Sequence, residues 1–411
     1  MSSQLSDSTV SVDDRERLTA ALAIALRVAP KARSVERALF FQLATLRVDP
    51  NSAPQELHAL WKVIRSIKPL DCFEHSTQIT FGYPETVNAI FLAGWLISRS
   101  QQSDVETAIS GLERYLLSDS LVVTEILAVR GVRFEQEITA GGYRLVPWAQ
   151  LPVSDRTWRI AERSVYGARM PDVAILRDHT ISSEHQRPWN LTNTRPVPSV
   201  EPIRDVLRCI SAASSAGIQM LHYWFEPPEW APWAANFTSF GTDASRLAMP
   251  VTLDEAMIGL IGKCVDRFSD SEESCRTRLR IPLDRLNQAS LAGMDFVTAA
   301  IEIGIALESL YVPSKLSEGI GYALRIRAAR HTAGNSVARR ATAKLVKDLY
   351  DLRSRAIHAG RFDADGKRKW LDSGVLQQVM EQGRRLVGQS LMKVILEGEP
   401  AWDEFDLSVD D

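Results

Sequence analysis

The sequence has few cysteines and no long uninterrupted hydrophobic run. Its four cysteines, Cys72, Cys209, Cys264 and Cys275, are too few and too scattered for a disulfide scaffold, so we expect a reducing compartment, the cytoplasm. The apolar run Ala89–Ser98 has about half the length that spans a bilayer, and Ala292–Val312 is interrupted by Asp and Glu. The first residues lack a basic stretch followed by an apolar one. We therefore expect neither a membrane span nor a secretory signal.

The chain also lacks a strong overall charge. Its formal net charge is −3, from 48 basic and 51 acidic residues, so any basic surface must be local. With 45% hydrophobic residues among 411, it can bury sizeable cores, and it is too long for one ordinary core. The composition therefore predicts a folded protein of two or three domains.

Composition divides the chain into three segments, which predict a multidomain α+β protein. Residues 1–120 are predicted to be all helical, since apolar residues recur at helical spacing. Residues 121–250 are predicted to be an α+β region, and residues 251–411 a helical bundle. In the first segment we expect apolar stripes from Leu18 to Val28, from Ala38 to Leu46 and from Leu57 to Ile64, the last in a helix that starts at Asn51-Ser52 ahead of Pro54. Further helices are expected at 84–98 and 104–117.

The middle segment is rich in β-branched residues from Leu121 onward. Ala140-Gly141-Gly142 predicts a turn between strands at 132–139 and 143–148, because glycines permit positive φ. Further strands are expected at 172–176 and 218–225, with a helix at 203–213 and a proline-rich loop at 182–202.

The last segment is predicted to hold consecutive helices. Thr252 begins a capping-box pattern with Glu255, which should open a helix ending near Phe268. Further helices are expected at 282–311, 317–332, 336–359 and 373–397, because Pro313, Gly334, Gly360 and Gly366 fall between them.

Most catalytic signatures are missing from the sequence. There is no complete phosphate-binding loop, dinucleotide fingerprint or nucleophile elbow. Cys264 and Cys275 lack C-x-x-C neighbours, and His179 and His185 lie in a predicted loop, so we expect no metal site. The aromatic stretch from His222 to Phe225, with Trp230, Trp233, Phe237 and Phe240, could stack on a base. Packing in a core is the favoured interpretation.

One segment does carry chemistry. Between Lys315 and Lys369 there are fourteen Lys or Arg and five Asp or Glu, an imbalance that favours a phosphate backbone. At about 100° per residue, Leu345, Leu349, Leu352 and Ala356 form a buried stripe, and Ser354 and His358 share the opposite face. Arg353 and Arg355 lie on the two flanks of the stripe. The alternative is a purely structural role, in which Arg355 pairs with Asp351 and His358 is a polar residue near a helix end.

The segment Arg353-Ser-Arg-Ala-Ile-His358 resembles the R-x4-6-H motif of the HEPN superfamily. The resemblance to its ApeA-like branch covers about residues 283–407 and includes the segments 305–311, 319–330 and 400–407. It implies a metal-independent endoribonuclease without cofactors, acting in toxin–antitoxin or antiviral defence. It also implies a homodimer in which two motifs form one site, with RNA as substrate and an inhibitor, antitoxin or activating ligand as a further partner.

Matched by position, the resemblance makes Arg353 and His358 the catalytic pair and places Ser354 at the polar position of the motif. An imidazole can move the proton of an RNA 2′-OH near neutral pH, and a guanidinium can stabilise the charge that develops on the phosphate. Glu308 could hold Arg353 through a bidentate ion pair, or could be an exposed helix charge.

The remaining cations are predicted to contact RNA phosphates or solvent; they are Arg355, Arg327 and Arg330. Residues 1–250 are predicted to sense a ligand or phage component. One alternative is a non-catalytic HEPN module that binds RNA, a nucleotide or a protein. Another is a regulator that binds its ligand in the middle region.

Overall fold

The computed structural model describes residues 9–29, 54–71, 73, 77–80, 83–86, 89–154, 157, 160–161, 170–182, 199–232, 237–240, 250–312, 319–359 and 373–407. The protein is a mixed helix-and-sheet fold whose contacts define two compact units. Unit 1 comprises Met1–Glu125, Asp178–Ser199 and Trp224–Thr238. Unit 2 comprises Ile126–Arg177, Val200–Tyr223 and Ser239–Asp411.

Unit 1 contains four of the described helices and a short hairpin. The helices are α1 (Val12–Val28), α3 (Gln55–Ser66), α5 (Ala89–Gln102) and α6 (Val105–Leu117). Asp104 caps α6 by accepting from the Thr107 amide at 2.7 Å. The prediction of an all-helical segment is wrong at β1 (Thr77–Thr80) and β2 (Tyr83–Thr86), which pair in antiparallel fashion where part of a helix was expected.

The expected stripe of α1 is confirmed in part. Leu18, Leu22 and Ala25 are fully buried, whereas Ile24 and Val28 are exposed, so the buried face is narrower than predicted. The stripe expected from Ala38 to Leu46 and most of the proline-rich loop lie outside the described residues.

A six-stranded sheet has the order β5-β6-β7-β3-β8-β9. Gly141 and Gly142, with φ of +58° and +77°, form the predicted turn between β5 and β6. His179, expected in a loop, lies in β7, which runs six residues beyond the predicted strand end. A separate parallel pair joins β4 to β10. The strand bounds are β3 Ser120–Arg130, β4 Val132–Arg133, β5 Ile138–Ala140, β6 Tyr143–Pro147, β7 Val173–Ser182, β8 Gln219–Glu226, β9 Phe237–Ser239 and β10 Val251–Thr252.

The aromatic stretch of β8 lies in the core. Tyr223 and Trp224 are fully buried and Phe225 is nearly so, which confirms the core interpretation for these three rings. The indole of Trp224 donates to Glu226 at 2.8 Å, so its one polar atom is satisfied within the protein.

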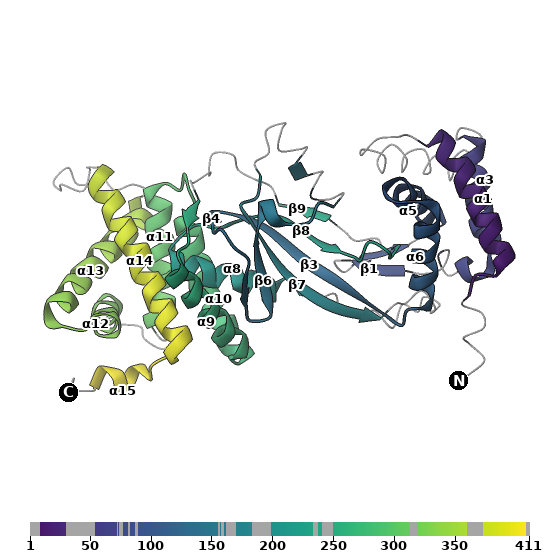
Figure 1. Ribbon diagram of the computed structural model, residues 1–411. Helices are drawn as coiled ribbons and strands as arrows, with labels where there is room; N and C mark the ends of the chain where they lie inside the picture. The colour runs from purple at the N-terminus through teal and green to yellow at the C-terminus, as the bar shows by residue number, and fades with distance from the viewer. Residues whose placement is uncertain are drawn as a thin grey trace. The chain divides into compact units, whose positions relative to one another are not determined.

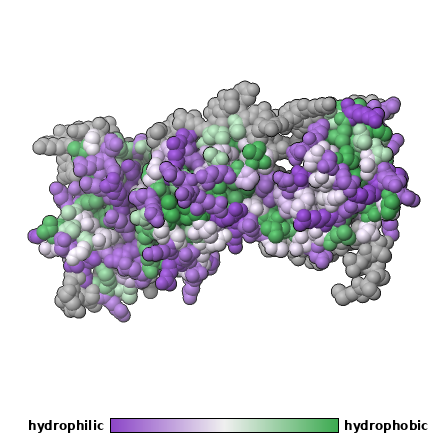
Figure 2. Space-filling view, viewed as in Figure 1, coloured by the Kyte–Doolittle hydropathy of each residue, from purple (hydrophilic) through white to green (hydrophobic). Residues whose placement is uncertain are grey.

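Unit 2 contains a bundle in which α14 packs on α8, α10, α11 and α13, and α12 packs on α13 (Figure 1). The helices are α8 Glu201–Ser214, α9 Glu255–Asp270, α10 Glu273–Ser290, α11 Phe296–Tyr311, α12 Ile320–Thr332, α13 Ser336–Ala359, α14 Ser373–Glu397 and α15 Trp402–Leu407. The predicted bounds of α13 and α14 are confirmed. In the left half of Figure 2, polar residues cover most of the visible face, with separate hydrophobic spots between them.

Two details of the last segment were predicted wrongly. The single helix expected at 282–311 is two helices, α10 and α11. Pro282 lies inside α10 rather than at a start, and the chain turns at Gly293, whose φ is +68°. The cap of α9 is Asp254, which accepts from the Met257 amide at 2.8 Å, whereas Thr252 belongs to β10.

Ion pairs join α8 to α10. Arg208, 3% exposed, donates to Asp284 from Nε at 2.7 Å and to Asp205 from Nη1 at 2.5 Å, and Arg280 reaches Asp205 at 2.7 Å. Burial lowers the pKa of Arg208, but the hydrogen bonds to Asp284 and Glu201 outweigh it and raise that pKa. The network fixes α10, against which α11 packs.

None of the helices in the described part of the chain has the length and apolar character needed to cross a membrane.

Candidate active site

The motif residues lie near the C-terminal end of α13. Leu349, Leu352 and Ala356 are buried and form the predicted stripe toward the bundle. Val346, rather than the expected Leu345, completes it. The stripe orients the helix, because residues on its flanks must be half-buried and those opposite must face solvent.

Arg353 is held by Glu308 from the neighbouring helix α11. Its Nη2 donates to the Glu308 carboxylate at 2.7 Å, and the two side chains are 20% and 25% exposed. The partner is thus the predicted one, but the contact uses one guanidinium nitrogen and is not bidentate. Nε of Arg353 is buried without a hydrogen-bond partner among the described residues.

Gly304 provides the room for the Arg353 side chain. A Cβ atom at this position would lie 2.2 Å from Cδ of Arg353 and 2.8 Å from its Cγ, far inside van der Waals contact. Gly304 is one turn before Glu308 on α11, so the two residues share a helix face. Sequence reasoning missed Gly304; the available signal was an isolated glycine within a helical pattern.

Electrostatics at the pair do not follow the simplest expectation. An ion pair by itself would lower the pKa of Glu308, yet that pKa is raised, because burial disfavours the charged carboxylate more than Arg353 favours it. The 2.7 Å contact and the raised pKa of Glu308 together indicate that burying this carboxylate costs more free energy than its pairing with Arg353 returns.

His358 is exposed, and Ser354 is half-buried one turn before it. Neither the His358 nor the Ser354 side chain has a hydrogen-bond partner among the residues that the structure describes, which exclude 360–372. His358 is five positions after Arg353, which corresponds to about 140° around the helix and roughly 7.5 Å along it. The long Arg353 side chain and the imidazole therefore have to bend toward each other to reach one phosphate in a single chain.

Arg355 is half-buried on the flank of the stripe opposite Arg353 and takes part in an interaction within the protein. Its expected phosphate contact stays a prediction.

The predicted phosphate contact of Arg327 stays untested, but its side chain lies inside the protein. Arg327 is 3% exposed, its Nη1 donates to the carbonyl of Tyr311 at 2.7 Å, and its guanidinium lies over the Trp402 ring. Arg330 is half-buried, with its guanidinium 5.0 Å from the centroid of Phe405. Both cations therefore stabilise the aromatic residues of α15, because guanidinium groups pack favourably on ring faces.

A buried polar network lies beside α11 and was not anticipated. The Tyr311 hydroxyl donates to Ser390 at 2.6 Å and lies 3.0 Å from Nδ1 of His331. Burial lowers the pKa of His331 to about 4, with a smaller lowering from Lys393, so the imidazole is neutral at pH 7. The network fixes the C-terminal end of α11, one turn from Glu308.

No family model, curated protein or solved structure matches this chain. The resemblance to HEPN proteins therefore stays a hypothesis that depends on the residues described above.

Proposed function

We propose that this protein is a metal-independent endoribonuclease of HEPN type, in which Arg353 and His358 act on the RNA backbone. The observation that carries the proposal is the Arg353–Glu308 pair, because it holds a guanidinium at the half-buried edge of a helix that also presents an exposed imidazole. Glu308 and Gly304 are positioning residues, since both act through Arg353.

The proposed reaction is transfer within RNA. The 2′-oxygen forms a bond to the adjacent phosphorus, the P–O5′ bond breaks, and the products are a 2′,3′-cyclic phosphate and a 5′-hydroxyl. The 2′-OH proton goes to one imidazole, and O5′ receives a proton from a second. Arg353 stabilises the extra negative charge on the non-bridging oxygens. A homodimer would supply His358 twice, with Ser354 hydrogen-bonding to the phosphate.

By the same resemblance, the protein would be a cytoplasmic toxin or antiviral effector that an inhibitor or activating ligand controls. Residues 1–250 are the proposed sensing part, because of their size and their separate composition.

One observation favours the alternative, a non-catalytic module that binds RNA, a nucleotide or a protein partner. Glu308 neutralises Arg353, and Arg327 is buried, so fewer cations are available to a phosphate than the sequence predicted. A weakly basic surface is sufficient for binding without transition-state stabilisation.

RNA cleavage in EDTA distinguishes the two functions. We expect the wild-type chain to leave 2′,3′-cyclic phosphate ends and to spare DNA of the same sequence, with Arg353→Ala and His358→Ala inactive. Arg340→Ala, an exposed arginine of the same helix, is the matched control and should cleave normally. Cleavage that persists in both motif variants would mean that the site is elsewhere. RNA binding that is unaffected by His358→Ala, without cleavage, would favour the binding module.

A further inference from the structure

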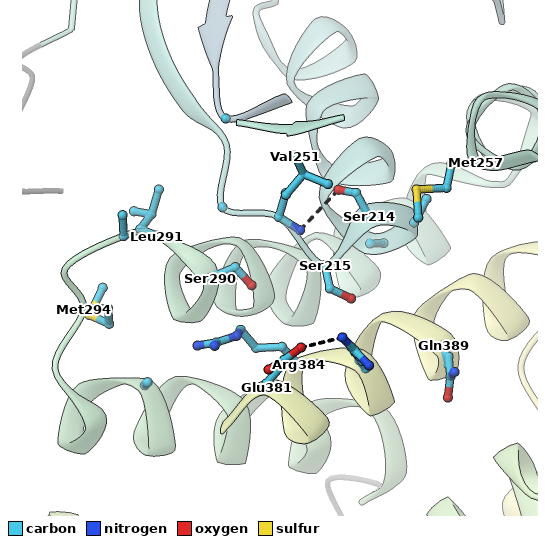
Figure 3. A pocket seen from close by; sticks show the side chains of 18 of the residues that line it. Ser214, Ser215, Val251, Met257, Ser290, Leu291, Met294, Glu381, Arg384 and Gln389 are labelled. Carbon is cyan, nitrogen blue, oxygen red and sulfur yellow. Dashed lines mark hydrogen bonds and ion pairs between the residues drawn. The ribbon is translucent and has the colours of Figure 1, made fainter. Parts of the chain in front are cut away.

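A pocket of about 870 Å³ lies within unit 2, where the ends of α8 and α10 face α14 (Figure 3). This volume is in the range of pockets that hold small organic molecules, roughly 300–1,000 Å³. Its lining comes from the ends of α8 and α10, the turn after α10, the start of α11, α9, β10 and one face of α14. The motif residues of α13 are not part of it, so the pocket is a site separate from the proposed active site.

The backbone around the pocket is fixed by close approaches. A Cβ atom on Gly217 would lie 2.2 Å from the Ser290 carbonyl oxygen, and one on Gly388 would lie 2.5 Å from that of Ala212. Asn287 binds both backbone groups of Ile218, accepting at 2.7 Å and donating at 3.0 Å. These contacts fix the backbone of the pocket wall on the α8 and α10 side.

Two unfavourable features occur at this wall. Ser215 has φ of +54° and is the one non-glycine residue with positive φ in the described part of the chain. The Ser290 hydroxyl is buried without a hydrogen-bond partner among the described residues. Backbone strain and unsatisfied polar atoms cost free energy and concentrate at functional sites.

Arg384 is a half-buried cation of α14 that lies beside Ser290 at the end of α10 (Figure 3). Its Nη1 donates to the Ala289 carbonyl at 3.1 Å. Burial lowers the pKa of Arg384, and Glu381 offsets this in part. Glu381 is itself bonded to Arg385, so in the described residues Arg384 has no carboxylate of its own. An anionic ligand would restore the favourable environment that this guanidinium lost on burial.

The rest of the lining indicates what kind of anion. Met257, Met294 and Met392 give the pocket an adaptable apolar surface. The C-terminal ends of α8 and α10 bring partial negative charge, and the start of α11 brings partial positive charge. Two cations, Arg384 and Arg385, and one carboxylate, Glu381, line the pocket, which matches a monoanion better than a dianionic phosphate. A carboxylate matches the guanidinium fork with a single charge.

We propose that this pocket binds a small organic monocarboxylate, with its carboxylate on Arg384 and Ser290 and its apolar body against Met257, Met294 and Met392. This binding is independent of the nuclease proposal.

Calorimetric titration of the full chain with octanoate tests the proposal, with octan-1-ol and inorganic phosphate as comparison ligands. Wild type should bind octanoate at least tenfold more tightly than octan-1-ol. Arg384→Gln should weaken octanoate binding at least tenfold. Arg384→Lys keeps the charge but lacks the paired N–H donors of the guanidinium, so it should weaken binding less than Arg384→Gln does. Leu260→Trp places a larger side chain at an exposed lining position and should weaken octanoate binding, while Arg340→Gln is the control and should bind normally.

Several results would overturn the proposal. The first is that octanoate gives neither heat nor an increase in melting temperature at millimolar concentration. The second is that octan-1-ol binds as tightly as octanoate, which would contradict the role of the anion. The third is that phosphate displaces octanoate, which would contradict the ligand class. Where Arg384→Gln fails to fold, the comparison of octanoate with octan-1-ol on the wild-type chain still decides the matter, because equal binding of the two would contradict the role of the anion.

Discussion

Replacing Gly304 by alanine tests how Arg353 is positioned. The added methyl carbon would start 2.2 Å from Cδ of Arg353, whereas carbon atoms in contact are separated by about 3.5–4.0 Å. The arginine stem therefore has to move by more than about 1 Å, which breaks its 2.7 Å contact with Glu308. Overpacking of this kind costs about 1–3 kcal/mol, and the better helix propensity of alanine returns about 1 kcal/mol. We expect a net loss of up to about 2 kcal/mol.

A double-mutant cycle separates the steric effect from other causes. In an Arg353→Ala background the two nearest atoms, Cγ and Cδ, are gone and only Cβ remains, 3.1 Å from the added carbon. Gly304→Ala should therefore cost clearly less than in the wild-type chain and be close to neutral. Gly259→Ala on α9 is the matched control, because no atom lies within 4 Å of the added carbon. This control should stabilise the wild-type chain by up to about 1 kcal/mol through helix propensity alone.

The measurements are urea denaturation of all variants and RNA cleavage by those that fold. The stability result does not depend on the nuclease proposal, whereas a loss of cleavage of more than tenfold in Gly304→Ala would support it. If Gly304→Ala stabilises the wild-type chain as much as Gly259→Ala does, the packing argument is wrong. If Gly304→Ala cleaves RNA at the wild-type rate while Arg353→Ala is inactive, the Glu308 contact is not needed for catalysis.

Three further predictions concern stability. The pKa of His331 falls from 6.5 in the unfolded chain to about 4 in the folded protein, so unfolding takes up a proton. The free energy of unfolding should therefore fall by up to about 3 kcal/mol as the pH drops from 6.5 to 4. Urea denaturation at pH 7 and 4.5 should show a smaller loss of this free energy in His331→Asn than in the wild-type chain. Asn287→Ala should cost about 1–3 kcal/mol, since both bonds to buried Ile218 are lost, and an unchanged denaturation midpoint would contradict this. Trp402→Ala should cost about 3–5 kcal/mol, with a loss of α15 protection in hydrogen exchange, because the ring packs on Tyr311; normal protection would refute it.

Sequence patterns predicted long helices better than short elements. The bounds of α13 and α14 followed from sustained apolar spacing over more than twenty residues, with breaks on either side. The β1–β2 hairpin was missed because each strand has only four residues, too few for a period to be recognised. Pro282 was read as a helix start because an interior proline is rare, yet tertiary packing retains it inside α10.

The site was predictable where it is local and not where it is tertiary. The shared face of Ser354 and His358 follows from helical spacing alone. The partnership of Glu308 with Arg353 was proposed, but it links residues 45 apart in the chain, and its single-nitrogen geometry could not be foreseen. The burial of Arg327 shows the same limit, since counting charges in a segment does not reveal which of them packing removes from the surface.

Several local costs converge on one guanidinium in this protein. Gly304 weakens helix α11 by about 1 kcal/mol relative to alanine, Glu308 is desolvated beyond what its partner offsets, and Nε of Arg353 is buried without a partner among the described residues. A second such group lies at the pocket, where Ser215 is strained and the Ser290 hydroxyl is unsatisfied. Sequences that fold well satisfy local rules nearly everywhere and violate them mainly at functional sites. The Arg353 site and the pocket both break these rules, and they are the two places in unit 2 where we expect chemistry and ligand binding.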